Sequence, residues 1–489
     1  MRSPFLSKSN YLIGLQCAKY LWTLFHEPEK IPPPDNITQH RFDQGHLVGQ
    51  LAKKLFPDGI DITTDNFSEN VKLTGQLMAQ HKPLFEAGIQ CGNIYCRVDI
   101  LHPAEQDKWN IIEIKSSTSV KDEHFDDVSF QKFCCDRTGL EISNCYLMHL
   151  NNQYVRKGEI NPAQLFIIEE ISAQVNEAGD GIADRIDEIL ALLAIDHCPD
   201  VPIGNHCGTP YSCPLIDTCW DFLRPGNIFE LYGRKVDTAQ LLEKGIFSIR
   251  EIPDEFLLSD KHRIQKTCEI TGKPHIDTEG ISRFLVALQY PYQFLDFETV
   301  NVAIPLFDGT SPYQQIPFQF SLHIKRDTTS ELEHVSFLSE NADDPRPALF
   351  ARLRNAIVNE GSIIVYNQSF EESILTGLAD AFPEYGDWID SVCDRLIDLL
   401  TPFRSFKYYH PEQGGTASLK SVLPALTGRS YDCLRITDGQ EAGLAFLDTI
   451  YGNISDEERN QTREDLQKYC GLDSEGMALI IDKLTDLSC

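Results

Sequence analysis

Residues 94–115 read IYCRVDILHPAEQDKWNIIEIK, and this stretch decides the fold of the N-terminal half of the chain. Two apolar segments flank the polar turn PAEQDK, a pattern that predicts two strands joined as a β-hairpin. Because side chains at i and i+2 point to one face of a strand, Glu113 and Lys115 should project together. The hairpin should bring Asp99 alongside them.

Two carboxylates and a lysine on one surface suit metal-assisted hydrolysis of a phosphate ester. Asp99 and Glu113 offer the oxygen ligands that Mg²⁺ prefers, and Lys115 would orient the attacking water or stabilise charge on the phosphate. His46, in a predicted helix before the hairpin, would add a ligand that favours Mn²⁺. Gln131, in a predicted helix after it, would orient the lysine or the substrate. The alternative is an ordinary strand with solvated charges, since such short motifs are common.

Four cysteines bracket this hairpin. Cys17 lies in GLQCAKYLW, and Cys207, Cys213 and Cys219 are evenly spaced in CGTPYSCPLIDTC, about 190 residues downstream. A loop containing Gly, Pro and Ser suits metal ligands better than core packing, although single cysteines are often small buried hydrophobes. Four thiolates fit either zinc or an iron–sulfur cluster. Either centre would tie the N-terminal segment to the far end of the domain.

The composition is that of an ordinary multidomain globular protein. The chain has 489 residues, of which 42 % are hydrophobic and 24 % charged, and its net charge is −30. The acidic balance counts against a protein that holds nucleic acid by bulk phosphate attraction, but bound metal ions reverse the sign of a carboxylate-lined site locally. We expect no membrane span and no secretory signal, and therefore a cytoplasmic protein.

Residues 1–225 resemble the RecB-type PD-(D/E)XK nucleases with an iron–sulfur staple, which include the CRISPR-adaptation nuclease and the C-terminal nuclease domain of AddB. The resemblance implies a restriction-endonuclease-like α/β core and a [4Fe–4S] cluster on the four cysteines. It also implies that His46, Asp99 and Glu113 bind Mg²⁺ or Mn²⁺ and that Lys115 is catalytic.

Three features depart from the pattern of that family. Val98, not proline, precedes the aspartate of the hairpin. Gln131 is followed by Cys135, where the family usually has a tyrosine that helps to position the substrate. The last three cysteines are also more widely and evenly spaced than in the CRISPR relatives.

A second acidic pattern begins at YQFLDFETV. Asp296 and Glu298 stand at i and i+2, on one face of the predicted strand. Glu371 lies in VYNQSFEES, where a strand is expected to run into a helix. Tyr469 and Asp473 in KYCGLDSEG share one helix face. Four acids from separate elements are what a two-metal phosphodiesterase needs, with the tyrosine positioning water. A solvated acidic pair is the alternative for the strand alone.

This half resembles the DnaQ-like DEDD exonucleases, and the Y-x3-D ending is similar to that of their tyrosine-bearing branch. Residues 290–435 also resemble a bacterial domain commonly fused behind the iron–sulfur nuclease unit. Glu371 stands where the exonuclease family usually has aspartate, and the longer side chain would shift a bound metal. Lys420 and the segment 404–410 would contact a strand by charge and stacking, or are ordinary surface.

The sequence therefore predicts a multidomain α/β protein. It comprises a PD-(D/E)XK domain over 1–225, a small helical connector over 226–288, and an RNase H-like DEDD domain over 289–489. The predicted activity is metal-dependent hydrolysis of DNA, at single strands or ends, in bacterial DNA repair, recombination or defence. Two alternatives remain: an RNA-processing nuclease, and a non-catalytic nucleic-acid-binding protein with degenerate sites.

Overall fold

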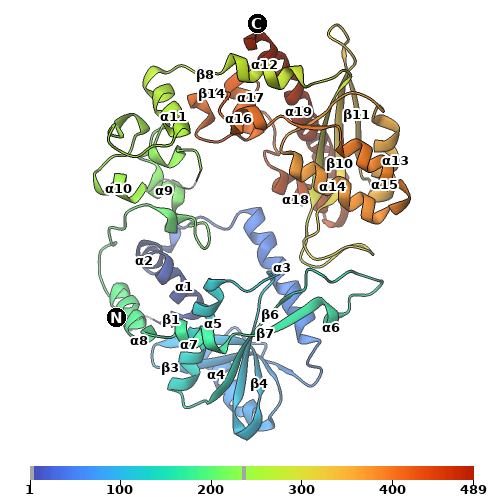
Figure 1. The fold of residues 1–489 in the computed structure, drawn as a ribbon. Helices are drawn as coiled ribbons and strands as arrows, with labels where there is room; N and C mark the ends of the chain where they lie inside the picture. The colour runs from blue at the N-terminus through green and yellow to red at the C-terminus, as the bar shows by residue number, and fades with distance from the viewer. Residues whose placement is uncertain (1–4, 234–237, 489) are drawn as a thin grey trace. The chain divides into compact units, whose positions relative to one another are not determined.

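The computed structural model describes residues 5–233 and 238–488 and divides into two compact units (Figure 1). Unit 1 comprises Met1–Asp221 and Val302–Gln314, and unit 2 comprises Phe222–Asn301 and Gln315–Cys489. Each unit is built on a mixed sheet with helices packed against it. The predicted multidomain α/β class is therefore confirmed.

Unit 1 contains a seven-stranded sheet. β4 (Ile94–Pro103) and β5 (Trp109–Ile114) pair antiparallel with Ile100 opposite Ile112, so the predicted hairpin is confirmed. β1 (Leu6–Ser7) pairs parallel with the start of β4. The remaining strands are β2 (Ile60–Asp61), β3 (Leu84–Cys91), β6 (Ile142–Leu150) and β7 (Phe166–Glu170). The order is β2-β3-β4-β5-β6-β7, and β5 and β6 are parallel.

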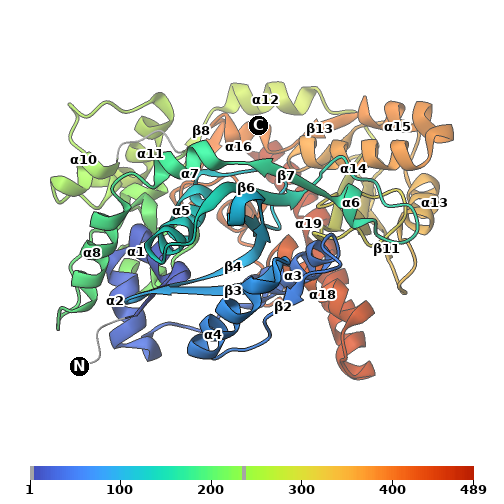
Figure 2. The same ribbon diagram turned by 90° about the horizontal axis from the view of Figure 1, so that it is seen from below.

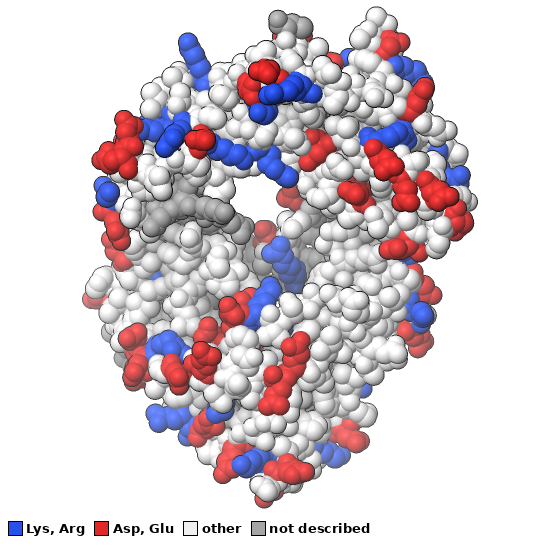
Figure 3. Space-filling model, viewed as in Figure 1, with Lys and Arg blue, Asp and Glu red and all other residues white. Residues whose placement is uncertain are grey.

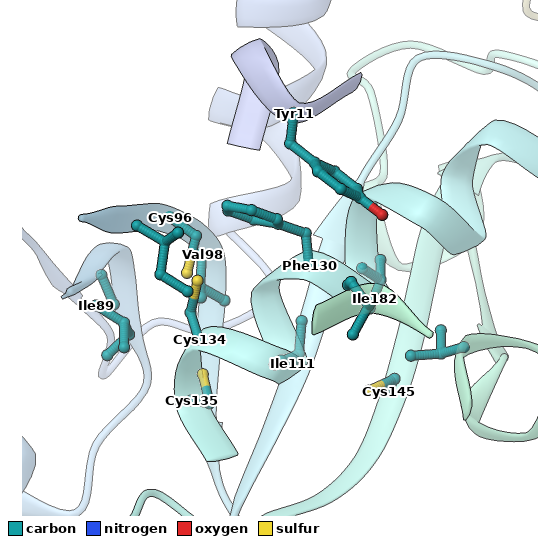
Figure 4. Close-up of a cluster of buried hydrophobic side chains, with 14 of the residues drawn as sticks. Tyr11, Ile89, Cys96, Val98, Ile111, Phe130, Cys134, Cys135, Cys145 and Ile182 are labelled. Carbon is teal, nitrogen blue, oxygen red and sulfur yellow. The ribbon is translucent and has the colours of Figure 1, made fainter. Parts of the chain in front are cut away.

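The helices of unit 1 cover both faces of this sheet. They are α1 (Lys8–Gln16), α2 (Ala18–His26), α3 (Asn36–Lys53), α4 (Phe67–Leu77), α5 (Asp122–Arg137), α6 (Pro162–Leu165), α7 (Ser172–Ala178), α8 (Ile182–Leu193) and α9 (Ile216–Trp220), with 3₁₀ turns η1 (Pro28–Lys30), η2 (Met78–Gln80), η3 (Glu105–Asp107) and η4 (Asn205–Cys207). Residues of α1, α5, α7 and α8 share one core with the sheet, whereas α3 packs on the other face (Figure 2). In the first core, Tyr11 stacks on Phe130 with ring centroids 4.8 Å apart (Figure 4).

The segment Val302–Gln314 belongs to unit 1 although it follows β9 (Tyr292–Val300) of unit 2 in sequence. Ala303 is buried in the core beneath α3, and its N–H donates to Gln44 Oε1 at 2.9 Å. Arg156 Nη1 donates to the carbonyl of Pro305 at 2.9 Å. Sequence periodicity does not predict that this segment packs in unit 1, because that packing depends on contacts between residues far apart in the sequence.

Unit 2 contains a five-stranded sheet in the order β11-β10-β9-β12-β13. The strands after β9 are β10 (Ile316–Lys325), β11 (Leu332–Leu338), β12 (Ile363–Val365) and β13 (Leu396–Asp398). β9, β10 and β11 pair antiparallel, and β12 and β13 run parallel to β9.

The helices of unit 2 also lie on both faces of its sheet. One face packs against α13 (Arg346–Ala356), α14 (Gln368–Ala381) and α15 (Gly386–Cys393). On the other face, Phe318 stacks on Phe446 of α18 (Gly439–Tyr451), and Gln319 Nε2 donates to a carbonyl of α19 (Asp456–Ser488). Shorter elements are η7 (Pro383–Tyr385), α16 (Thr401–Arg404), β14 (Tyr408–Tyr409), η8 (Pro411–Gln413) and α17 (Leu419–Thr427). Within residues 5–233 and 238–488, no helix combines the length and apolar character needed to cross a bilayer.

The segment predicted as a connector consists mainly of short helices. Its elements are η5 (Ile228–Glu230), α10 (Thr238–Glu243), η6 (Ile249–Glu251), α11 (Asp260–Thr271), β8 (His275–Ile276) and α12 (Thr278–Val286). Ile228, Leu241 and Ile249 form a small core of their own. Because β8 pairs with β14, this segment packs as part of unit 2.

Truncation of Phe130 tests the core of unit 1. Phe130 is fully buried, so Phe130→Ala should lower the free energy of unfolding of unit 1 by about 3–5 kcal/mol through lost burial and the cavity left behind. Phe42 on α3 is 52 % exposed, so Phe42→Ala should change it by less than about 0.5 kcal/mol. Urea unfolding of both variants measures the difference, and equal effects would contradict this core assignment.

Candidate functional sites

The first candidate site lies where β4, β5 and α5 of unit 1 meet. Asp99 Oδ2 accepts a hydrogen bond from the backbone N–H of Ile114 at 2.8 Å, which holds the carboxylate against β5. Glu113 is 1 % exposed. Lys115 Nζ lies 2.7 Å from Glu113 Oε1. The hairpin therefore places the three predicted residues together on one side of the sheet.

Two further charged residues that sequence reasoning missed complete this site. Lys8, the first residue of α1, places its Nζ 2.8 Å from Glu113 Oε1 and 3.1 Å from Asp127 Oδ1. Asp127 of α5 is buried, and its Oδ2 lies 2.5 Å from Lys115 Nζ. Two lysines therefore bridge the same two buried carboxylates.

Gln131 hydrogen-bonds two of the acids of this site. Its Nε2 donates to Glu113 Oε2 at 2.7 Å and to Asp127 Oδ1 at 2.9 Å. A carboxylate has about four lone-pair positions, and three on Glu113 are thus taken by protein donors. A divalent cation would therefore find its free positions on Glu113 Oε2 and on Asp99. These oxygens fit a hard cation such as Mg²⁺ or Mn²⁺.

The charges of this site shift each other's titration. Burial, with the neighbouring Glu113 carboxylate, raises the pKa of Asp99 to about 7. Burial alone would lower the pKa of Lys115, but the carboxylates of Asp127 and Glu113 outweigh it and hold that pKa above its usual range. Lys115 is therefore an ammonium at neutral pH, and a cation arriving at Asp99 would displace a proton.

His46 is not brought to these acids. The side chain is exposed on α3, whereas Val48 and Ala52 of the same helix face the sheet. Two residues correspond to about 200° of helix rotation, so His46 points away from the face on which Val48 packs. Among the described residues, the group with three His, Cys, Asp or Glu ligand atoms within 4.8 Å of one another contains neither His46 nor the acids of this site. The placement of His46 does not support its prediction as a metal ligand.

The four predicted cysteines line one small cavity in unit 1. Cys17 lies between α1 and α2, and its Sγ accepts a hydrogen bond from the Tyr20 N–H at 3.5 Å. Burial raises the pKa of Cys213 to about 11, and the nearby thiols of Cys17, Cys207 and Cys219 add to the shift. Four free thiols that face one cavity fit a thiolate-bound metal centre, and this donor set suits zinc and iron–sulfur alike.

The second candidate site lies in unit 2, on the face of the sheet covered by α19. Asp296 and Glu298 project from β9, as their i, i+2 spacing predicts. Asp296 is paired across the sheet with Ser321, which hydrogen-bonds Ser474 of α19 at 2.7 Å. Asp473, next to Ser474, therefore approaches the acids of β9. Glu298, Asp473 and Glu371 of α14 are all buried.

Burial is the main electrostatic influence on the acids of this second site, and neighbouring carboxylates add to it for three of them. Burial, and then the Asp473 carboxylate, raises the pKa of Asp296 well above its usual range. Burial and neighbouring carboxylates act in the same direction on the pKa values of Glu298 and Glu371. Burial raises the pKa of Asp473 only to about 6, because hydrogen bonds from Tyr431 and Tyr469 and the charge of a nearby lysine oppose it. Asp296 thus interacts with all three other predicted acids, although the described group of ligand atoms within 4.8 Å that holds Asp296 and Glu298 does not include Glu371 or Asp473.

The donor set of the second site fits a divalent cation. Asp296, Glu298 and Cys470 offer ligand atoms within 4.8 Å of one another. Within the described part of the chain, Glu371 Oε2 is buried without a hydrogen-bond partner, which is costly for a carboxylate unless a cation or proton satisfies it. The Cys470 thiol, which sequence reasoning missed, donates to Asp296 Oδ2 at 3.4 Å.

Two tyrosines and a lysine surround Asp473. The Tyr431 hydroxyl, also missed in the sequence, donates to Asp473 Oδ1. Tyr469, one turn before Asp473, is buried, and burial followed by the Asp473 carboxylate raises its pKa, so it stays a neutral phenol. Lys420 Nζ lies 4.9 Å from the centre of the Tyr469 ring. Lys420 therefore brings positive charge to the site.

Comparison with known proteins identifies relatives of parts of the chain. Residues 293–418 match a family described as a domain of unknown function (DUF2779), a range that includes the acids of β9 and α14 but not Asp473. A Mycoplasma pneumoniae protein named "Uncharacterized protein MG366 homolog" is 27 % identical over 210 residues, which cover 38 % of this chain and 31 % of that protein. "Uncharacterized protein MG366" of Mycoplasma genitalium is 26 % identical over 219 residues, covering 40 % and 32 %. The chain thus spans about a third of the length of these relatives.

The raised pKa values predict a pH-dependent stability of metal-free unit 2. A carboxyl whose pKa is raised by folding stabilises the fold below its ordinary pKa, near 4, and this contribution is lost as the pH rises through the folded value. Asp473 reaches about 6 in the fold and its neighbours are raised further. In EDTA, the melting temperature of unit 2 should therefore fall by roughly 5 °C or more between pH 4.5 and pH 8. At pH 8, Mn²⁺ should restore it.

A pair of adjacent glutamates provides the control. Glu371→Gln removes a buried acid and should flatten both the pH dependence and the Mn²⁺ effect. Glu372→Gln changes the neighbouring exposed acid and should alter neither. Thermal melts followed by circular dichroism measure both variants, and a response shared equally by the two would refute the site.

Proposed function

We propose that the chain is a metal-dependent nuclease of the bacterial cytoplasm that hydrolyses DNA phosphodiester bonds at two separate sites. The observation that carries this proposal is the convergence of Asp296, Glu298, Glu371 and Asp473 with an unpartnered oxygen on Glu371. Such a cluster of buried acids is stable at neutral pH only when protons or cations compensate it. Phosphodiester hydrolysis is one of the reactions that such metal ions catalyse, by activating water and stabilising the leaving oxygen.

In unit 2, the four acids would hold Mg²⁺ or Mn²⁺. Such ions activate water and stabilise the leaving oxygen when bound. Tyr469 stays neutral and presents a hydroxyl that orients the attacking water. Lys420 offers positive charge to the phosphate. The antiparallel run β9-β10-β11 continued by parallel β12 and β13 supports an RNase H-like fold, and with it a 3′→5′ exonuclease of the DnaQ-like type.

In unit 1, Asp99 and Glu113 would hold the ion, and Lys115 supplies the charge that stabilises the phosphate in the transition state. Asp127 and Gln131 hold Lys115 and Glu113 in place. The antiparallel hairpin β4-β5, followed through α5 by a parallel β6, supports the restriction-endonuclease-like core of the PD-(D/E)XK class. The exposed His46 leaves this site with fewer ligands than the family pattern implies.

We propose that the partner is DNA and that it is bound mainly at the two metal sites. Lys, Arg, Asp and Glu side chains are interspersed over the visible face, which agrees with a net charge of −30 (Figure 3). Recognition would then depend on the metal sites and a few nearby cations, so binding should weaken less with salt than in a basic nucleic-acid-binding protein. A role in DNA repair, recombination or defence follows from the family resemblance alone.

Alanine variants of the two sites test the activity. Lys115→Ala should lower cleavage by unit 1, and Asp473→Ala cleavage by unit 2, each by about 10²–10³-fold, because Lys115 would stabilise charge in the transition state and Asp473 would hold the ion that does so. Labelled single-stranded and duplex DNA with Mg²⁺ or Mn²⁺ provides the assay, in which the other site is disabled. Lys108→Ala and Asp482→Ala, which change more exposed residues, should leave the rates unchanged.

Parallel assays on labelled RNA decide between the polymers. Cleavage of RNA but not DNA would show that the chain is an RNA-processing nuclease. The acidic residues themselves do not distinguish the two polymers, because that distinction depends on contacts with the 2′-hydroxyl group of RNA. Binding without cleavage, unaffected by either variant, would make the chain a nucleic-acid-binding protein and refute the nuclease proposal.

The four cysteines are proposed to bind a [4Fe–4S] cluster. Protein purified without oxygen should be brown, with an absorbance band at about 400 nm from iron–thiolate ligation. Cys213→Ala should lose the colour and the bound iron. Cys198→Ala, which changes an exposed cysteine nearby, should keep both. Stoichiometric zinc in a colourless protein would identify a zinc centre instead.

A further inference from the structure

Lys8, the first residue of α1, holds its ammonium group between two buried acids. Its side chain is 18 % exposed, and its ammonium lies 2.8 Å from Glu113 Oε1 and 3.1 Å from Asp127 Oδ1. These are the distances of charge-assisted hydrogen bonds. The two acids already share a second ammonium, that of Lys115.

The position of Lys8 is set by the backbone and by core packing. β1 pairs with β4 through Leu6 and Ser7, directly before Lys8. Ser7 then caps α1, since its hydroxyl accepts a hydrogen bond from the Asn10 N–H at 3.2 Å. Tyr11, one turn after Lys8, is fully buried against Phe130 of α5. The fold therefore delivers the ammonium to the acids, which a mobile surface lysine would reach only part of the time.

The charge balance of this site resembles that of a two-metal site in which one cation is provided by the protein. Asp99, Glu113 and Asp127 supply three carboxylates, and the two lysines supply two positive charges. In two-metal sites the ions lie about 3.5–4 Å apart and share a bridging carboxylate. Glu113 is placed to act as that bridge, because Lys8 binds its Oε1 while Oε2 keeps a free lone pair.

We propose that Lys8 is a positioning residue that takes the place of a second divalent cation, so that the site in unit 1 binds one ion where its carboxylates would otherwise bind two. This inference rests on the proposed metal-dependent function of that site. Removal of the ammonium frees one lone-pair position on Glu113 Oε1 and one on Asp127 Oδ1, while Lys115 and Gln131 keep their own contacts with these oxygens. A second Mn²⁺ should then bind between them.

Counting bound Mn²⁺ ions tests this inference without reference to cleavage. All chains carry Asp296→Asn and Glu298→Gln, so that the site in unit 2 does not contribute. Lys8→Met keeps the aliphatic stem and removes the charge, and calorimetric titration should show one more Mn²⁺ per chain than in the parent. Lys8→Arg keeps the charge and should show no extra ion. Lys132→Met removes another carboxylate-paired lysine, on the outside of α5, and should also leave the count unchanged.

The difference in ion count decides the matter. One Mn²⁺ in the parent site and two in Lys8→Met, with no extra ion in Lys8→Arg or Lys132→Met, support the inference, even where the chain does not cleave DNA and the proposed function fails. An unchanged count in a folded Lys8→Met chain overturns it. Should Lys8→Met unfold, Lys8→Gln gives a second neutral variant judged by the same count. In the active chain, Lys8→Met should lower kcat by about tenfold or more, with KM little changed, because substrate is held by other groups.

Discussion

The burial of neighbouring carboxylates in unit 2 is the constraint on which its site depends. Burial raises the pKa values of Asp296, Glu298, Glu371 and Asp473, and neighbouring carboxylates raise those of the first three further. Protein groups compensate part of this charge, since Tyr431 donates a hydrogen bond to Asp473, Cys470 donates one to Asp296, and Lys420 brings positive charge. Protons or cations must compensate the rest, since an isolated buried carboxylate is far too costly. Hydrophobic packing on the faces of the sheet stabilises the fold enough to offset the cost of bringing these acids together.

In unit 1, lysine side chains compensate the charge of the buried carboxylates. Glu113 and Asp127 are as deeply buried as the acids of unit 2, but Lys8 and Lys115 neutralise them directly. Burial, and then the Glu113 carboxylate, raises the pKa of the third acid, Asp99, to about 7. A divalent ion in unit 1 therefore competes with ammonium groups, whereas in unit 2 it relieves repulsion. The two sites should accordingly differ in metal affinity even though both rest on an acidic strand.

Local sequence patterns predicted the parts of both sites that lie on one strand or helix face. The i, i+2 spacing of Glu113 with Lys115, and of Asp296 with Glu298, placed each pair correctly because strand geometry alone decides it. Lys8, Tyr431 and Cys470 were missed, since each reaches its site through tertiary packing that no local periodicity reports. His46 illustrates the opposite limit. The family resemblance predicts it as a metal ligand, but the rotation of α3 leaves its side chain exposed. The same limit explains why the transfer of Val302–Gln314 to unit 1 could not be foreseen.

The four cysteines join segments that packing already holds in part. Trp22 Nε1 donates to the carbonyl of Ile195 at 3.1 Å, and the His26 ring contacts that of Leu193 at 3.1 Å, so α2 is fixed to the end of α8 without any metal. The stretch from there to Cys219 contains little regular structure. Loop-closure entropy rises only slowly with length, so the long separation from Cys17 adds little by itself. A metal centre would therefore act mainly by ordering the stretch before Cys219 against a helix pair that the core has already placed.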